Sequence, residues 1–165
     1  MNSNLIITIG REYGTGGREI GQKLALRLGV PFYDRELITR AAKKTGFDEK
    51  LFEQLDKRAT NSFLYSLTMF GSVGLNGMSL TDQLYLAQSN IIREMAEDSS
   101  CVIVGRCADH VLRDFPNKFD FFIHGSIEDR VKRVQTCGDY VIEGKTPEAA
   151  LEKMDKQRST YYNYY

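Results

Sequence analysis

A glycine-rich stretch close to the start of the chain carries residue types suited to binding phosphate. It reads Gly10-Arg11-Glu12-Tyr13-Gly14-Thr15-Gly16-Gly17-Arg18-Glu19-Ile20-Gly21. Glycines let the backbone curl close to a phosphate group, and the N–H groups and dipole at a helix start favour negative charge. The stretch therefore indicates an anion site, provided that a strand precedes it and a helix follows it.

The flanking residues predict that arrangement. An apolar run at 5–9 is typical of a short buried strand. On the other side, Ile20, Leu24 and Leu28 are spaced four apart, which predicts one buried stripe of a helix. A strand, a glycine turn and a helix start together form the local structure that binds phosphate.

Several arginines are placed where they could add to such a site. The guanidinium group suits phosphate because it presents a planar fork of donors. These arginines mostly follow predicted strands, lie in loops or share one helix: Arg11, Arg18, Arg35, Arg40, Arg106, Arg130, Arg133 and Arg158. Taken one at a time, each is better explained as a solvated surface charge.

The elements that must position these residues alternate between strands and helices. In chain order the sequence predicts a strand at 5–9, a helix through 20–28, an extended piece at 30–33, helices beginning at 34 and 48, a loop at 71–77, a helix from 79 to about 97, a strand at 101–105, a helix at about 107–113, a strand at 119–124, a helix beginning at 126 and a helix from 146 towards 158. This alternation is typical of an α/β protein with a mostly parallel sheet. Right-handed crossovers then place helices on both faces, which gives three layers.

Apolar stripes and caps orient two of these helices. The helix at 79–97 should bury a stripe made of Leu84, Gln88 with Ala87, Ile91 and Met95. The later helix, capped by Ser126 with Asp129 three residues on, should bury Ile127, Val131 and Val134. Thr146 followed by Pro147 marks the start of the last helix.

Glycines follow the predicted strands and mark one edge of the sheet. Gly10, Gly105 and Gly125 each come directly after a strand. Ligands of parallel sheets bind beyond the carboxyl ends of the strands. Arg11, Arg18 and Arg106 would be carried to that edge, and their convergence favours a functional role over surface decoration.

The loop departs from the standard P-loop pattern G-x-x-x-x-G-K-[ST]. Aligned on Gly14-Thr15-Gly16, the lysine position holds Gly17 and the Ser/Thr position holds Arg18. One extra residue also separates Gly10 from Gly16. Arg18 could restore the positive charge, and Thr15 is the candidate for the hydroxyl that reaches Mg²⁺. The alternative is a tight glycine turn without a ligand.

The composition limits the number of domains, the kinds of partner and the cellular location that are expected. The 165 residues suit one domain, 1–165, and 42% hydrophobic and 27% charged residues are ordinary for a globular protein. The formal net charge is zero, so neither nucleic acid nor a membrane surface is expected as a partner. Cys101, Cys107 and Cys137 lack metal-ligand spacing and suit reduced thiols, and no signal peptide is evident. We therefore expect a cytoplasmic protein with no protein-held metal.

Four separated segments carry a resemblance that extends over nearly the whole chain. They lie at 10–20, 32–34, 102–109 and 155–165. Together they resemble the cytidylate kinase-like family, a branch of the P-loop nucleoside monophosphate kinases with the same Gly-Gly-Arg phosphate loop. The resemblance implies a P-loop kinase-like fold with a helical acceptor-binding insertion at about 34–80 and a short lid at about 136–160. It also implies a further strand and helix, beyond residue 165, that support the adenine site.

The resemblance assigns roles to matching positions. The donor phosphates would be bound by Gly14, Thr15, Gly16, Gly17, Arg18 and Glu19, and the acceptor by Asp34, Arg40, Arg106 and Asp109. The catalytic cations would be Arg18, Arg130, Arg133 and Arg158, with the last three arriving on lid closure. Asp34 is equally explained as a helix N-cap, and Arg130 and Arg133 as a solvated helix face. Cys107 replaces the aspartate of a family Gly-Arg-Asp motif and is better explained as a small buried thiol than as a reactive group.

The implied reaction is transfer of the ATP γ-phosphoryl group to a nucleoside monophosphate such as CMP. ATP is the implied cofactor, with Mg²⁺ bound through the nucleotide, and the partners are small-molecule nucleotides. Two alternatives remain open. One is a regulatory nucleotide-binding protein that kept the fold and lost catalysis, because the loop lacks its lysine. The other is a kinase for a different small-molecule acceptor.

Overall fold

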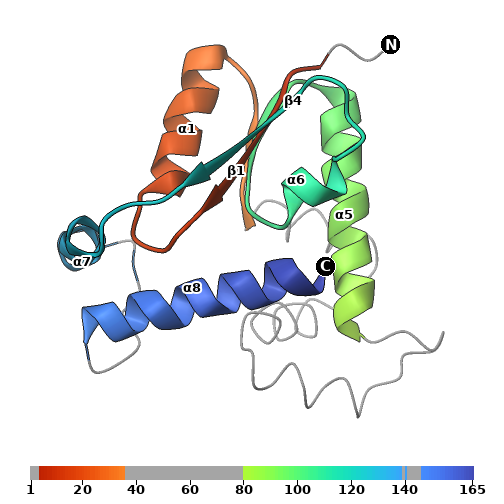
Figure 1. The fold of residues 1–165 in the computed structure, drawn as a ribbon. Helices are drawn as coiled ribbons and strands as arrows, with labels where there is room; N and C mark the ends of the chain where they lie inside the picture. The colour runs from red at the N-terminus through yellow and green to blue at the C-terminus, as the bar shows by residue number, and fades with distance from the viewer. Residues whose placement is uncertain (1–3, 36–79, 139, 141–145) are drawn as a thin grey trace.

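A computed structural model describes residues 4–35, 80–138, 140 and 146–165 (Figure 1). Its elements are β1 Ile6–Arg11, α1 Gly17–Leu28, β2 Phe32–Tyr33, α5 Leu80–Asp98, β3 Cys101–Val104, α6 Ala108–Val111, β4 Lys118–Ile123, α7 Ile127–Thr136 and α8 Pro147–Tyr164. The helices predicted from 34 and 48, the loop at 71–77, the acceptor-binding insertion and Arg40 lie outside the described residues.

The described strands form one parallel sheet in the order β2-β3-β1-β4. β1 is central: Ile6 pairs with Cys101 of β3 on one side and with Lys118 of β4 on the other. Parallel neighbours require a crossover through the intervening chain, which explains why the strands alternate with helices. The parallel α/β architecture expected from the sequence is confirmed.

Alternate residues of the central strands point to opposite faces, and each face has its own helices. Ile7, Ile9, Val102 and Val104 pack with Ala25 of α1. On the opposite face, Ile6, Cys101 and Ile103 belong to a cluster with residues of α5 and α6. Figure 1 shows α1 on one side of the sheet, α5 and α6 on the other, and α8 passing across the carboxyl ends of the strands.

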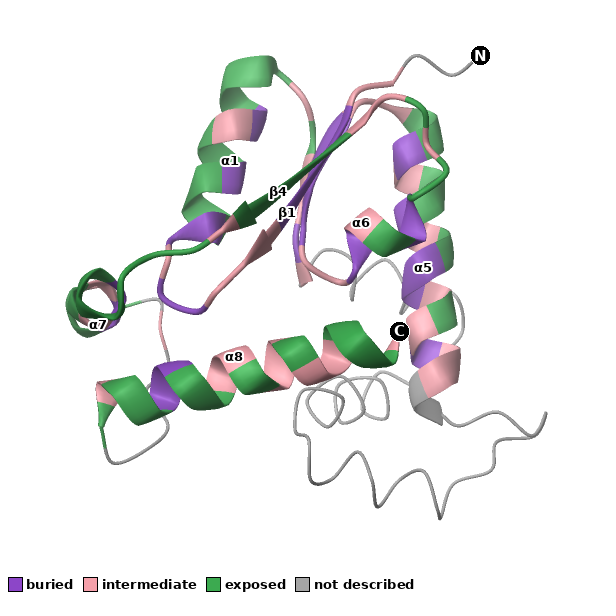
Figure 2. Ribbon diagram, in the orientation of Figure 1, coloured by how far each residue is buried: buried purple, intermediate pink, exposed green. Residues whose placement is uncertain are grey.

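The buried stripe of α1 differs from the expected one. Gly17, Gly21 and Ala25 are buried, whereas Ile20 and Leu28 are each 44% exposed. A Cβ atom on Gly21 would lie 2.7 Å from Cγ2 of Val104, so the helix axis lies close to the sheet. Small residues therefore face β3. Of the predicted stripe, Leu24 alone is half-buried against the cluster that contains Ala25, and Figure 2 shows most other positions of α1 as exposed.

In α5 and α7, some residues of the buried face differ from the predicted ones. In α5, Leu84 and Gln88 are buried as expected, but Ile92 and Ala96 complete the face in place of Ile91 and Met95. They do so because both belong to the cluster around Ile6 of β1, which sets the rotation of the helix.

In α7, Val134 is buried and Val131 is half-buried, but Ile127 is 51% exposed. Arg130, one turn further along the helix, is buried instead and is 7% exposed. The predicted caps hold: Ser126 Oγ accepts from the Asp129 amide at 3.1 Å, and Thr146 Oγ1 accepts from the Ala149 amide at 3.2 Å. None of the described helices is long and apolar enough to cross a membrane.

Two helix lengths also differ from expectation. The helix expected at about 107–113 is shorter, Ala108–Val111. It begins only after Arg106 and Cys107, which adopt positive φ angles, and Leu112 caps its end. The last helix continues beyond Arg158 to Tyr164. Its length lets α8 span the whole carboxyl edge of the sheet.

Candidate functional site

The glycine loop lies between β1 and α1 and packs against α7 and α8. Gly14 and Gly16 have φ angles of 83° and 77°, which favour glycine. A Cβ atom on Gly14 would lie 2.9 Å from Val134 and 3.0 Å from Leu151. The Thr15 hydroxyl closes the turn by donating to the Glu12 carbonyl at 2.9 Å. The strand, turn and helix start predicted from the sequence are therefore present.

A second turn at the same edge carries Arg106. Gly105 directly follows β3 with φ 81°, and Arg106 and Cys107 come next with φ 60° and 51°. Non-glycine residues rarely adopt this conformation, which costs about 1–3 kcal/mol each and is concentrated at functional sites. The turn places the Arg106 guanidinium over the Tyr161 ring of α8, 5.8 Å from its centroid.

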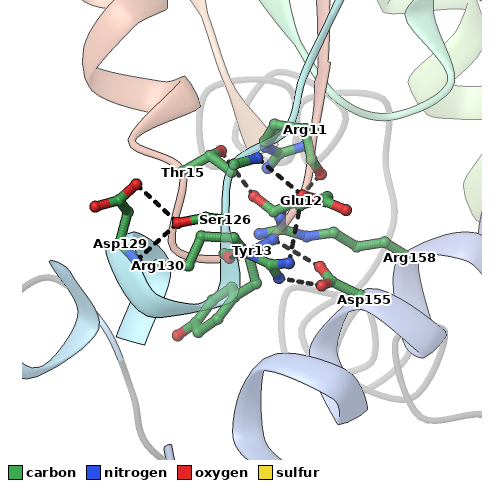
Figure 3. A network of polar contacts seen from close by, with 10 residues as sticks. Arg11, Glu12, Tyr13, Thr15, Ser126, Asp129, Arg130, Asp155 and Arg158 are labelled. Atoms are coloured by element: carbon green, nitrogen blue, oxygen red, sulfur yellow. Dashed lines mark hydrogen bonds and ion pairs between the residues drawn. The ribbon is translucent and has the colours of Figure 1, made fainter. Parts of the chain in front are cut away.

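Arg130 of α7 forms the centre of a polar network that joins the loop to α8 (Figure 3). Its Nε donates to the Tyr13 carbonyl at 2.8 Å, Nη1 lies 3.3 Å from Glu12, and Nη2 pairs with Asp155. Asp155 Oδ1 also accepts from the Tyr13 amide at 2.6 Å. We call Arg130, Glu12, Tyr13 and Asp155 the clamp. Arg130 is buried, so the alternative that it lies on a solvent-exposed face of its helix is excluded.

Glu12 is among the site residues that the sequence patterns did not identify, together with Asp155 and Tyr162. Besides pairing with Arg130, the Glu12 carboxylate accepts from the backbone amide of Gly125 at 3.1 Å, two residues after the end of β4. Glu12 therefore joins the ends of β1 and β4. Gly125 was expected at this edge, but no local signal identifies a carboxylate whose partner lies 113 residues away.

Arg158 of α8 lies next to the clamp and contacts the end of β1. It donates from Nη1 to the Arg11 carbonyl at 3.2 Å, and its guanidinium is 5.2 Å from the centroid of the Tyr13 ring. Burial lowers the pKa of Arg158, and the charge of Asp155 opposes that shift. The side chain is therefore a desolvated cation at the loop.

Described residues at the carboxyl edge line a cavity of about 650 Å³. Its positive side chains are Arg11, Arg35, Arg106 and Arg158, which we call the cavity arginines. Burial of the guanidinium, and then the charges of Arg158 and Arg106, lower the pKa of Arg11 to about 9. The lining also contains the carboxylates of Glu12, Asp109, Asp120 and Asp155, so the like charges are crowded around Arg11, where they favour an anionic ligand.

Asp109 lines the same cavity as Arg106. Its carboxylate accepts from the Tyr162 hydroxyl at 2.6 Å, and this hydrogen bond, with burial, raises the pKa of Tyr162 to about 12. Cys107 is 5% exposed, and burial raises its pKa to about 12. The small buried thiol expected at this position is confirmed, because a reactive cysteine needs a lowered pKa.

The remaining predicted residues pair with one another around α1. Arg18 Nε lies 2.7 Å from Asp34 Oδ2, with a side chain that is 55% exposed against 7% for Asp34. Arg133 pairs with Glu19, whose other partner is Lys23 at 2.6 Å. The structure thus pairs Arg18, predicted to bind the phosphates of the donor nucleotide, with Asp34, predicted to bind the acceptor nucleotide.

The described residues contain no group of three or more His, Cys, Asp or Glu side chains that could hold a metal ion. The Thr15 hydroxyl, the sequence candidate for reaching Mg²⁺, donates to a backbone carbonyl. The carboxylates of Glu12 and Asp155 are engaged by Arg130. In the described part of the chain, the residues therefore do not fit a metal held by the protein alone.

Comparisons with solved structures agree with this architecture. A protein described as uncharacterized from Eubacterium ventriosum is 32% identical, with 98% of this chain and 78% of that chain covered and a TM-score of 0.70. Shikimate kinases from Acinetobacter baumannii and Bacteroides thetaiotaomicron are 15% and 16% identical. They cover 99% and 96% of this chain, and 80% and 82% of their own, with TM-scores of 0.54 and 0.55. At that identity the likeness shows a shared kinase fold.

Sequence comparison assigns the family. No match is found among curated protein sequences. The sequence profile described as the cytidylate kinase-like family matches residues 6–165, from the first strand through the last helix. The glycine loop, the arginine-lined cavity and the parallel sheet all lie within that match, and the chain belongs to the cytidylate kinase-like family.

Proposed function

We propose that this protein transfers the γ-phosphoryl group of ATP to a nucleoside monophosphate such as CMP. One observation carries the proposal: the cavity arginines gather beside a glycine loop that leads into a helix start. Phosphoryl transfer needs positioning and charge neutralisation of phosphates, with little covalent chemistry from the protein. An arginine-lined cavity next to an anion-binding turn provides both.

On the donor side, the loop from Gly14 to Glu19 would bind the ATP phosphates through backbone amides at the start of α1. The clamp supports this role because it fixes both backbone polar groups of Tyr13, immediately before the loop. A preorganised loop needs no rearrangement when charge develops in the transition state. Mg²⁺ would enter with the nucleotide and neutralise phosphate charge.

On the acceptor side, Arg106 would bind the monophosphate, with Asp109 and Tyr162 lining the same cavity. Arg40 and Asp34, also assigned to the acceptor by family resemblance, complete the proposal. Arg158 would reach the phosphates from α8. Arg130 and Arg133 of α7, which family resemblance also assigns to the phosphates, pair in this structure with Asp155 and Glu19 and would position the loop. The replacement of the family aspartate by Cys107 leaves the base of the acceptor to be determined by assay.

A second candidate is a nucleotide-binding protein that has lost catalysis. It is favoured by Gly17, which occupies the lysine position of the standard pattern, and by Arg18, which pairs with Asp34. In standard P-loop enzymes that lysine reaches the β- and γ-phosphates. Binding without turnover is the signature of this alternative.

The test measures ADP release from ATP and Mg²⁺ with CMP, dCMP, UMP and AMP as acceptors, and with shikimate as a non-nucleotide acceptor. We expect turnover with one monophosphate and a loss of at least tenfold in Arg158→Met. The matched control is Arg27→Met, because Arg27 is an exposed arginine in the last turn of α1. ATP binding without turnover on any acceptor would instead establish the second candidate, and turnover on shikimate alone would reassign the acceptor.

A further inference from the structure

The loop lacks the cation that a lysine would provide, and the adjacent arginine is directed elsewhere. Gly17 occupies the lysine position in the alignment on Gly14-Thr15-Gly16. Arg18, the sequence candidate for replacing that charge, pairs with Asp34 at 2.7 Å, and its side chain is 55% exposed. This pairing favours another position as the source of a cation for the donor phosphates.

Arg11 lies over the position that a lysine side chain would occupy. A Cβ atom built on Gly17 would lie 2.8 Å from Cβ, 2.9 Å from Cγ and 3.6 Å from Cδ of Arg11. The aliphatic part of Arg11 thus fills the space into which a side chain at 17 would extend. Contacts below 3.0 Å to this packed stem mean that the two positions cannot both carry large side chains.

The guanidinium of Arg11 is held at the second turn of the site. A Cβ atom on Gly105 would overlap Nη1 of Arg11, and Gly105 has the positive φ of 81° that favours glycine. Arg11 therefore extends from the end of β1, across Gly17, to the backbone of Gly105. Two glycines provide the room for one arginine.

The charges around Arg11 point to an anion as its ligand. Arg158, Arg106 and Arg35 act on it electrostatically and oppose its charge, and Asp34 favours it. The side chain lines the cavity together with these three arginines. A cation crowded by like charges is stabilised when a polyanion binds.

We propose that Arg11, carried on the end of β1, supplies the cation that a lysine at position 17 supplies in the standard P-loop. The proposal rests on the proposed function, because it concerns the phosphates of the nucleotide bound there. The guanidinium contacts the donor phosphate oxygens as a planar fork, and Gly17 is small because the stem of Arg11 passes over it.

The test uses the full chain and measures ATP affinity by calorimetry, separately from turnover. Arg11→Met keeps an unbranched stem over Gly17 and removes the charge. We expect at least tenfold weaker ATP binding and about 100-fold lower kcat, as for loss of one preorganised charge-stabilising group. Arg27→Met, the control defined above, is expected to bind ATP as the unmodified protein does.

If Arg11→Met folds poorly, a second pair of variants, in which the large side chain is moved from position 11 to position 17, still tests the proposal. Gly17→Lys alone places a side chain against the Arg11 stem and should unfold at lower temperature. Arg11→Gly combined with Gly17→Lys creates the standard lysine position, and we expect it to recover ATP binding to within tenfold of the unmodified protein.

Two results overturn the proposal. One is ATP affinity and kcat within twofold of the unmodified protein in Arg11→Met. The other is a larger loss in Arg18→Ala than in Arg11→Met. Failure of the proposed function looks different, since the unmodified protein would then bind ATP without turning over any acceptor, and the affinities of the Arg11 and Gly17 variants would still decide the role of Arg11.

Discussion

Arginines occupy two neighbouring regions of the carboxyl edge under opposite electrostatic conditions. In the clamp, Arg130 is buried and pairs with two carboxylates, Glu12 and Asp155. In the cavity, Arg11 is surrounded by Arg35, Arg106 and Arg158, and its pKa is lowered to about 9. Arg130 is therefore paired with carboxylates of the protein, whereas like charges lower the pKa of Arg11.

The difference separates a positioning role from a binding role for the same residue type. A buried arginine that is fully paired stabilises the folded chain only while its partners are present. A group of arginines crowded together opposes folding slightly and favours a bound polyanion. Removing an arginine should therefore lower stability in the clamp and lower phosphate affinity in the cavity.

The largest effect is expected for Arg130→Ala. The change removes an ion pair to two carboxylates and the hydrogen bond to the Tyr13 carbonyl. We expect the free energy of unfolding to fall by about 3 kcal/mol, the low end for breaking a buried pair, because the carboxylates are partly exposed. Urea denaturation measures it, and a loss below about 1 kcal/mol would remove the distinction between the clamp and the cavity.

Arg158→Met tests the other side of the comparison. Loss of the hydrogen bond to the Arg11 carbonyl is offset by relief of charge crowding, so we expect stability to change by about 1 kcal/mol or less. Tripolyphosphate should bind about tenfold more weakly, as for a charge-assisted contact of about 1.4 kcal/mol. Calorimetric titration measures the affinity. Unchanged binding with a large loss of stability would place Arg158 in the clamp.

A smaller effect is expected for Arg133→Ala, one turn away from Arg130 in α7. Arg133 pairs with Glu19, and its side chain is 34% exposed. An ion pair in such a position contributes about 0.2–1 kcal/mol and weakens with salt. Thermal unfolding at low and high salt should therefore show a small loss for this variant at low salt and almost none at high salt.

The smallest effect concerns pH and Tyr162 of α8. Donation to Asp109, with burial, raises the pKa of Tyr162 from 10.0 to about 12. Because the folded pKa is the higher one, this contribution is fully present below pH 10 and is lost as the pH rises towards 12. Tyr162→Phe should flatten the decline in Tm over that window. An unchanged pH profile would show that the contact does not influence stability.

Local patterns in the sequence were sufficient for the strands and the helix starts. The runs at 5–9 and 101–105 are continuous apolar segments, as parallel strands buried on both faces require. Ser126 and Thr146 cap the helices that they were expected to cap, because capping depends on a few adjacent residues.

Rotation of the helices and the partners of charged groups depend on distant residues. Hydrophobic periodicity selected Ile20 in α1 and Ile127 in α7, but the close approach of Gly21 to Val104 and the burial of Arg130 reversed both. Alignment by position pointed to Arg18, since it cannot show that the stem of Arg11 passes over Gly17. The role of each arginine at the site stays a prediction, as does that of Arg40, which lies outside the described residues.

The hydrogen bond from the Tyr13 amide to Asp155 has a consequence for the order of folding. It joins residues 142 positions apart, so the glycine loop acquires its fixed shape only after α8 has docked. Contacts of such sequence separation form late because chain closure must precede them. During synthesis from the N-terminus, β1 and the loop leave the ribosome early. The anion site is complete only after residues up to Asp155 have also been synthesised.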